Sequence, residues 1–228
     1  MPNSDKPRAD LLVANASELL TCVPARDDLV GRIRGGSVAV AGEQIIAAGP
    51  AAAVAELVDT TKAEVIDASG KIVAPGFVDC HTHLIFGGSR AQEYAARMTH
   101  SADEVKAMGI PTGILATVEM TRAASMQTLA FSAAERVRRM FRCGTTTLES
   151  KSGYGLSLRD ELKILEVNRW LRANQPVDVV STFLGAHAFP GDMPREKYLG
   201  LVVDELRHGV PSHAPDCDRR FRRPLGAE

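Results

Sequence analysis

The chain has 228 residues, of which 45% are hydrophobic and 24% are charged, and its formal net charge at pH 7 is -1. This composition is typical of a globular protein with one large or two modest domains, and it excludes a global electrostatic attraction to nucleic acid or to an anionic membrane. The four cysteines are widely spaced and no stretch approaches the roughly 20 apolar residues of a membrane span, so we expect a cytoplasmic protein without a membrane partner.

Short apolar runs separated by glycine and proline fill the first part of the chain. Such runs, bounded by turn residues, are typical of strands, and they predict a small β-unit over residues 1–70. The runs lie at 11–13, 37–40, 44–47 and 63–67. A further run leads from Lys71 to Phe77-Val-Asp79, which we expect to be a buried strand.

Three helices are predicted in the second half of the chain, and local signals mark the ends of the first two. Ser125 can cap the first, in which Leu129, Ala133 and Val137 recur at helical spacing, and Gly144 suits the residue that follows a helix end. The second begins after Ser157 and ends at the Gln175-Pro176 break.

Strands are predicted to alternate with these helices, at 145–148 and 177–184, and a last helix is predicted from 194 to about 206. This alternation favours parallel βαβ units and an α/β fold. We count about three units over residues 71–207, whereas a closed (β/α)8 barrel needs eight and typically about 250 residues. Residues 208–228 lose the apolar periodicity and are interpreted as a divergent, solvated tail.

A pair of histidines follows the strand that ends near Asp79. Residues two apart on a strand face the same side, so His81 and His83 can meet one metal ion at the carboxyl end of that strand. Two histidines also share a strand face without any metal. The segment Pro75-Gly-Phe-Val-Asp79 directly before the pair favours the metal interpretation, because active sites in barrels of parallel strands lie at the carboxyl ends of the strands.

Several segments resemble a known enzyme family. Residues 75–83 are similar to the first barrel strand of the amidohydrolase superfamily, and the β-unit before them is similar to the small sandwich that precedes this barrel. Residues 84–90, 149–156 and 182–187 resemble the imidazolonepropionase family, in that order. The resemblance covers roughly residues 9 to 205. It implies an incomplete metal-dependent (β/α)8 amidohydrolase barrel preceded by a small β-sandwich unit.

The resemblance also implies a reaction and a site. The family hydrolyses the C–N bond of 4-imidazolone-5-propanoate to N-formimidoyl-L-glutamate in histidine degradation, with one divalent metal ion, zinc or iron. By resemblance, His81 and His83 bind the metal, and Arg90, Tyr154 and His187 bind the substrate. The oligomeric state is left open, with a homo-oligomer among the alternatives.

Each of these assignments has a plainer alternative. Arg90 is otherwise a surface arginine, Tyr154 a turn-packing tyrosine and His187 a core histidine. Lys151 is left outside the metal set, because the resemblance is to a one-metal family. The family's remaining metal ligands and its catalytic residues lie on later strands that this chain does not contain. A catalytically incompetent fragment, or another amidohydrolase such as a deaminase or a dihydroorotase-like enzyme, is therefore a competing hypothesis.

Overall fold

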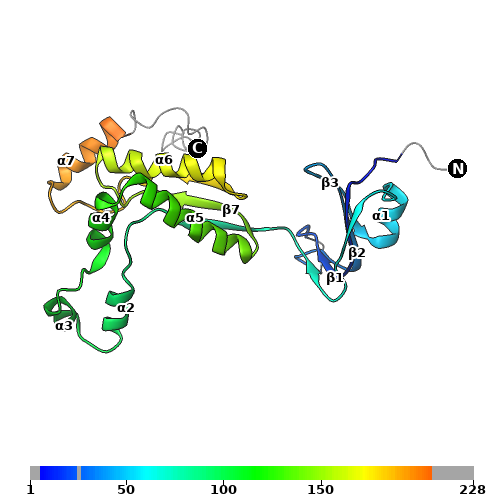
Figure 1. Cartoon of the computed structure of the whole chain (residues 1–228), viewed down its shortest axis with the longest axis horizontal. Coiled ribbons are helices and arrows are strands. Elements are labelled where there is room, and N and C mark those ends of the chain that lie inside the picture. The colour runs from blue at the N-terminus through cyan, green and yellow to red at the C-terminus, as the bar shows by residue number, and fades with distance from the viewer. Residues whose placement is uncertain (1–5, 25–26, 207–228) are drawn as a thin grey trace. The chain divides into compact units, whose positions relative to one another are not determined.

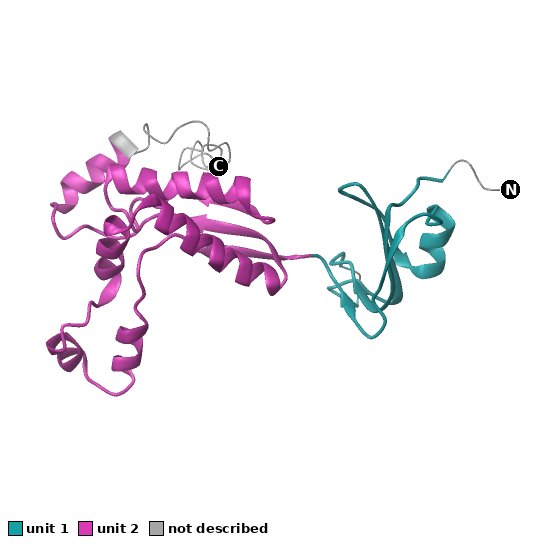
Figure 2. Ribbon diagram, in the orientation of Figure 1, with its two compact units in different colours: residues 1–75 teal, residues 76–228 magenta. Residues whose placement is uncertain are grey.

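A computed structural model describes residues 6–24 and 27–206, and the predicted tail at 208–228 lies outside these residues. The chain divides into two compact units, residues 1–75 and residues 76–228 (Figure 2). Each unit has its own sheet and its own core.

The first unit is built on one five-stranded sheet (Figure 1). Its order is β3-β2-β1-β4, and β5 also pairs with β1. The β1–β2 and β2–β3 pairs are antiparallel, whereas β4 and β5 run parallel to β1. The elements are β1 (Leu11–Leu20), β2 (Arg32–Ala41), β3 (Gln44–Pro50), α1 (Ala51–Leu57), β4 (Glu64–Asp67) and β5 (Ile72–Val73).

Both faces of this sheet carry buried apolar side chains. Ala39 packs with Val54 of α1 on one face, whereas its neighbour Val38 packs with Leu19 on the other, as expected for side chains that alternate along a strand. The described residues of this unit form one sheet and a helix, and they contain no second sheet that would make a sandwich. β5 shows that the sheet extends beyond residue 70, where we placed the boundary.

The second unit contains a parallel three-stranded sheet with the order β6-β7-β8. Helices α5 and α6 connect the strands, which confirms the predicted βαβ alternation, and they pack together against one face of the sheet (Figure 1). The elements are β6 (Phe77–Thr82), α5 (Met126–Arg142), β7 (Thr145–Lys151), α6 (Leu158–Asn174) and β8 (Asp178–Thr182).

Local signals explain where α5 and α6 begin and end. The Ser125 hydroxyl accepts the Thr128 backbone N–H and the Ser157 hydroxyl accepts the Asp160 backbone N–H, so both predicted N-caps are confirmed. Gly144 follows α5 with φ +92°, a conformation that favours glycine. The apolar faces of both helices pack against the sheet. The resulting core includes Leu129, Val137, Leu148, Ile164, Val167, Leu171 and Val179.

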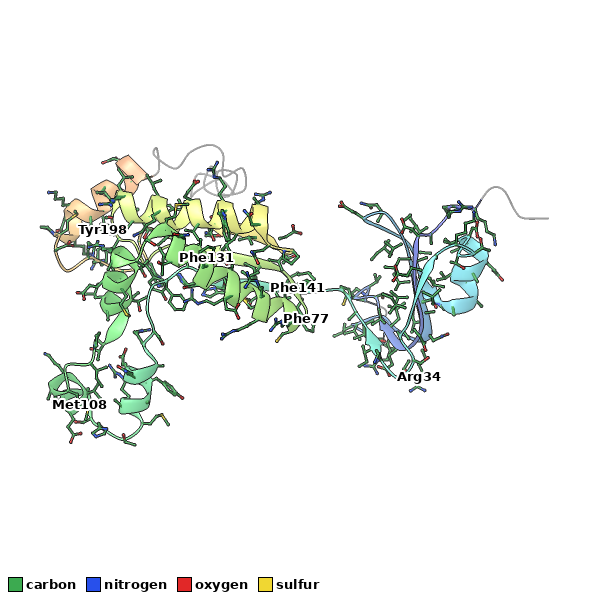
Figure 3. All side chains as sticks on the ribbon, in the orientation of Figure 1. Arg34, Phe77, Met108, Phe131, Phe141 and Tyr198 are labelled. Atoms are coloured by element: carbon green, nitrogen blue, oxygen red, sulfur yellow. The ribbon has the colours of Figure 1, made fainter. Side chains whose placement is uncertain are left out.

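The prediction that Phe77–Asp79 is a buried strand is wrong as to burial. Phe77, which is labelled in Figure 3, and its neighbour Val78 have exposed fractions of 63% and 67%. The physical reason is that β6 lies at the edge of the sheet, where β7 is its only partner among the described residues. A strand is buried on both faces only when other elements cover it, which a sequence run cannot specify.

Three short helices that we did not predict connect β6 to α5: α2 (Ala91–Arg97), α3 (Ala102–Ala107) and α4 (Gly113–Ala123). The predicted helix from 194 to 206 is divided into α7 (Arg195–Gly200) and a π-helical segment, Leu201–Leu206. Tyr198 of α7 is fully buried (Figure 3), and its hydroxyl donates to the Gly185 carbonyl, close to the predicted site residue His187. Within the described ranges, no helix has both the length and the apolar character that a membrane span requires.

The core of the second unit predicts the effect of a cavity. Leu129 of α5 is fully buried, so we expect Leu129→Ala to lower the free energy of unfolding by about 2–5 kcal/mol, measured by urea denaturation followed by circular dichroism. Leu199→Ala removes the same atoms from a side chain that is 38% exposed and serves as the control. Equal losses in the two variants would contradict the assignment of the core.

Candidate active site

Three predicted site residues meet where the parallel strands end. His83 follows β6, Tyr154 follows β7 and His187 follows β8. The His83 ring centroid lies 4.7 Å from that of Tyr154 and 4.6 Å from that of His187, and the Tyr154 and His187 centroids are 5.5 Å apart. The structure therefore brings together residues that are far apart in sequence, at the edge where sites form in parallel sheets.

A glycine allows this close approach. Gly153 has φ +112°, and a Cβ atom placed on it would lie 2.6 Å from the Cβ of His187 and 2.7 Å from the Leu184 carbonyl oxygen. Any larger residue would push the loop after β8 away from the loop after β7. Gly153 is therefore needed for the contact between Tyr154 and His187.

A small pocket of about 260 Å³ adjoins this cluster, and Arg90 and Tyr154 both line it. Its remaining lining residues are Phe86, Gly87, Ser89, Thr117 and Met120. Helix α4 contributes Thr117 and Met120 to the lining, and the Gly87 backbone N–H donates to the Thr121 hydroxyl of the same helix at 3.0 Å. The pocket is concave, partly apolar and sized for a small molecule.

Arg90 immediately precedes α2 and is held by a buried acid. Its Nη1 atom lies 3.5 Å from Glu93 Oε2, while Arg97 donates to the other carboxylate oxygen at 2.9 Å. Glu93 also accepts the Gly113 backbone N–H at 3.2 Å, which links α2 to the start of α4. The Arg90 side chain remains 42% exposed, so its guanidinium can still bind a carboxylate in the pocket.

His83 has the properties of a metal ligand. Burial lowers its pKa to about 4, assisted by electrostatic interactions with His187, Lys151 and His81, so the imidazole is neutral at pH 7. Its Nδ1 atom is buried and has no hydrogen-bond partner among the described residues. A neutral imidazole with an unpaired buried nitrogen fits a divalent metal ion.

His81 lies at the end of β6 and is exposed. Its backbone N–H donates to the Asp79 carboxylate at 3.3 Å, and its side chain is not among those lining the pocket. Nowhere in residues 6–24 and 27–206 do three or more histidine, cysteine, aspartate or glutamate side chains gather closely enough to hold a metal ion. His81 and His83 thus offer two imidazoles at this strand end.

Glu149 is a residue that the sequence analysis missed. Its carboxylate accepts hydrogen bonds from the Lys151 ammonium and, at 2.7 Å, from the Thr182 hydroxyl. Its backbone carbonyl accepts a hydrogen bond from the Thr82 hydroxyl. One residue thereby joins all three strands close to His83. The signal was present in the sequence, because Glu149 and Lys151 are two apart on a strand and share a face.

The pKa of His83 predicts a pH dependence of stability. The folded protein disfavours the protonated His83 ring, whose pKa is about 4 in the fold and 6.5 ordinarily. The free energy of unfolding is therefore highest above pH 6.5 and decreases as the pH falls toward 4. We expect a loss of about 1–2 kcal/mol over this window, less than the full shift would give because water screens the partly exposed ring.

The measurement is urea unfolding at several pH values in the presence of a chelator, with His83→Gln as the comparison. The free energy of unfolding of the wild type should fall relative to that of His83→Gln as the pH falls. A difference that is constant from pH 7 to pH 4 would contradict the lowered pKa.

Comparisons with known proteins identify sequence relatives of this chain. Residues 64–144 match the Amidohydrolase family. The imidazolonepropionase of Symbiobacterium thermophilum is 44% identical over 210 residues, which cover 88% of this chain and 49% of the relative. That of Geobacillus kaustophilus is 44% identical over 181 residues, which cover 78% of this chain and 42% of the relative.

Among solved structures, A. niger ochratoxinase shares the fold, with a TM-score of 0.50 and 15% identity over 86% of this chain and 37% of that one. This likeness concerns the fold alone. The chain is therefore similar in sequence to imidazolonepropionases, a segment of it matches the Amidohydrolase family, and it spans about half the length of the curated relatives it matches.

Proposed function

We propose that this chain forms part of an imidazolonepropionase, which hydrolyses 4-imidazolone-5-propanoate to N-formimidoyl-L-glutamate in histidine degradation. The observation that carries the proposal is that Arg90 and Tyr154 line one pocket while the rings of His83 and His187 pack against Tyr154. The relatives at 44% identity support the choice of substrate.

The substrate chemistry fits the side chains at the pocket. The substrate carries a propanoate group, and the planar fork of Arg90 can bind a carboxylate through two hydrogen bonds. We assign the substrate ring to the neighbourhood of Tyr154 and His187, whose aromatic faces and polar atoms suit a flat, amide-like heterocycle. Arg90, Tyr154 and His187 are thus the proposed substrate-binding residues.

His81 and His83 are the proposed ligands of one divalent metal ion, zinc or iron. The neutral state and the unpaired Nδ1 atom of His83 support this assignment. Such an ion, when bound, supplies an acidified water molecule that can attack the ring carbon. Imidazole suits both metals, so two histidines do not choose between them. Lys151 is paired with Glu149, which agrees with its place outside the metal set.

We further propose that the β6-β7-β8 sheet and its helices are units of a (β/α)8 barrel. The parallel strand order and the clustering of site residues at the strand ends support this assignment.

Cys22, Cys80 and Cys143 are free and exposed, which suits the proposed cytoplasmic location.

The reaction can be tested directly. Purified chain loaded with zinc or iron is mixed with 4-imidazolone-5-propanoate, and the substrate's ultraviolet absorbance should fall in the metal-loaded sample but not after chelation. His83→Ala should abolish the fall. Persistence of the substrate would reject hydrolysis by this chain. Retained binding of the analogue imidazole-4-propanoate would then identify a ligand-binding fragment that lacks activity.

Arg90 provides a separate test of substrate recognition. Arg90→Lys keeps the positive charge but loses the two-pronged geometry, so the dissociation constant for imidazole-4-propanoate should rise about ten-fold or more in calorimetric titration. Arg97→Lys is the matched control, because Arg97 contacts the same Glu93 but is not among the pocket-lining residues. Equal effects of the two substitutions would contradict the assignment of Arg90.

A further inference from the structure

The loop that carries Tyr154 is held by two charged side chains that the proposed chemistry does not use. Glu161 belongs to α6 and Arg122 belongs to α4. Glu161 accepts hydrogen bonds from backbone N–H groups of the loop, and Arg122 donates hydrogen bonds to its carbonyl groups. Together they fix the backbone on both sides of Tyr154.

Glu161 is fully buried and accepts three backbone hydrogen bonds. Its Oε2 atom accepts the Gly153 N–H at 3.0 Å, and its Oε1 atom accepts those of Gly155 and Leu156 at 2.8 and 2.9 Å. A buried carboxylate is costly unless it is hydrogen-bonded, and these three donors provide that compensation. The acid is therefore matched to the loop in one backbone conformation.

Arg122 binds the carbonyl groups of the same loop. Its Nε donates to the Gly155 carbonyl at 2.7 Å and its Nη2 donates to the Leu156 carbonyl at 2.8 Å. Its Nη1 atom contacts the Asp192 carboxylate at 3.2 Å, which keeps the guanidinium paired. The planar fork thus binds two consecutive carbonyls, a geometry that lysine cannot reproduce.

The loop conformation needs such support. Leu156 has φ +49°, an uncommon conformation for a residue with a side chain, and Gly153 has φ +112°. A Cβ atom on Gly155 would lie 2.5 Å from backbone atoms of Asp160 and Glu161, so the loop is pressed against the start of α6. Glu161 and Arg122 supply hydrogen bonds that stabilise this backbone conformation.

We propose that Glu161 and Arg122 are positioning residues, which hold Tyr154 against His83 and His187 and so fix one wall of the substrate pocket. They act through the backbone of residues 153–156 and do not touch the ligand. The effect on ligand binding rests on the proposed function, whereas the effect on the order of the loop does not.

The first test measures loop order in the full chain by amide hydrogen exchange. Glu161→Gln replaces an acceptor oxygen with a donor, so exchange at Gly153, Gly155 and Leu156 should accelerate about ten-fold or more, while exchange in the α5 core stays unchanged. The control is Glu166→Gln on the exposed side of the same helix. Unchanged protection of the three amides in folded Glu161→Gln would overturn the proposal.

Arg122→Lys is the second variant, which serves if Glu161→Gln does not fold. Arg122 is partly exposed, so this substitution removes the fork without leaving a buried, unpaired charge. It should free the same loop and weaken the nuclear Overhauser contacts between the Tyr154 and His83 rings. Arg169→Lys, an exposed change on α6, is its control. Retention of these contacts in Arg122→Lys would count against a positioning role.

The second test separates positioning from simple structural support. Imidazole-4-propanoate is titrated into four proteins: the wild type, Glu161→Gln, Tyr154→Ala and the double variant. If Glu161 acts through Tyr154, Glu161→Gln should weaken binding about ten-fold in the first background and have little effect when Tyr154 is absent. Equal weakening in both backgrounds would overturn the proposal. Failure of the wild type to bind would reject the proposed function, and the exchange experiment would still decide loop positioning.

Discussion

The parallel pairing of β6, β7 and β8 is the constraint on which the site depends. Because the three strands run in one direction, their carboxyl ends lie at one edge, and the residues that follow them meet there. The pairing also sorts the side chains by face. Leu148 and Val179 turn toward the helices, whereas Glu149 and Lys151 turn to the opposite face and join the strands through Thr182. One backbone arrangement therefore creates both the core and the polar surface near His83.

Charge at this edge is distributed in a way that suits an anionic ligand and a cation at adjacent positions. Glu93 and Glu149 are engaged by neighbouring arginine, lysine and threonine groups. Arg90 lines the pocket, and burial lowers the pKa of the His83 ring so that it is neutral at pH 7. A carboxylate-bearing substrate beside a metal-binding imidazole is chemically consistent with this pattern, and it is the basis of the proposed function.

Side chains from the helices donate hydrogen bonds to backbone carbonyl groups of the loops that form the site. Arg136 of α5 donates to the Leu84 and Phe86 carbonyls, and its guanidinium lies 3.6 Å from the centroid of the Phe86 ring. Lys163 of α6 donates to three carbonyls near the end of α4, among them that of Thr121 at 3.1 Å. Loops otherwise expose unpaired polar groups, so these contacts let irregular segments keep one conformation. The positioning role proposed for Glu161 and Arg122 belongs to the same pattern.

The sequence alone determined the local features of this protein. The caps at Ser125 and Ser157 and the apolar spacing of α5 and α6 depend on residues within a few turns, so the sequence alone predicts them. The His81-x-His83 spacing at a strand end was readable for the same reason, whereas Arg90, Tyr154 and His187 were named by resemblance. Only the tertiary structure decided that β6 is an exposed edge and that Arg90 and Tyr154 share a pocket. It also decided which groups bind the loop around Tyr154, because such contacts join distant segments and no local pattern encodes them.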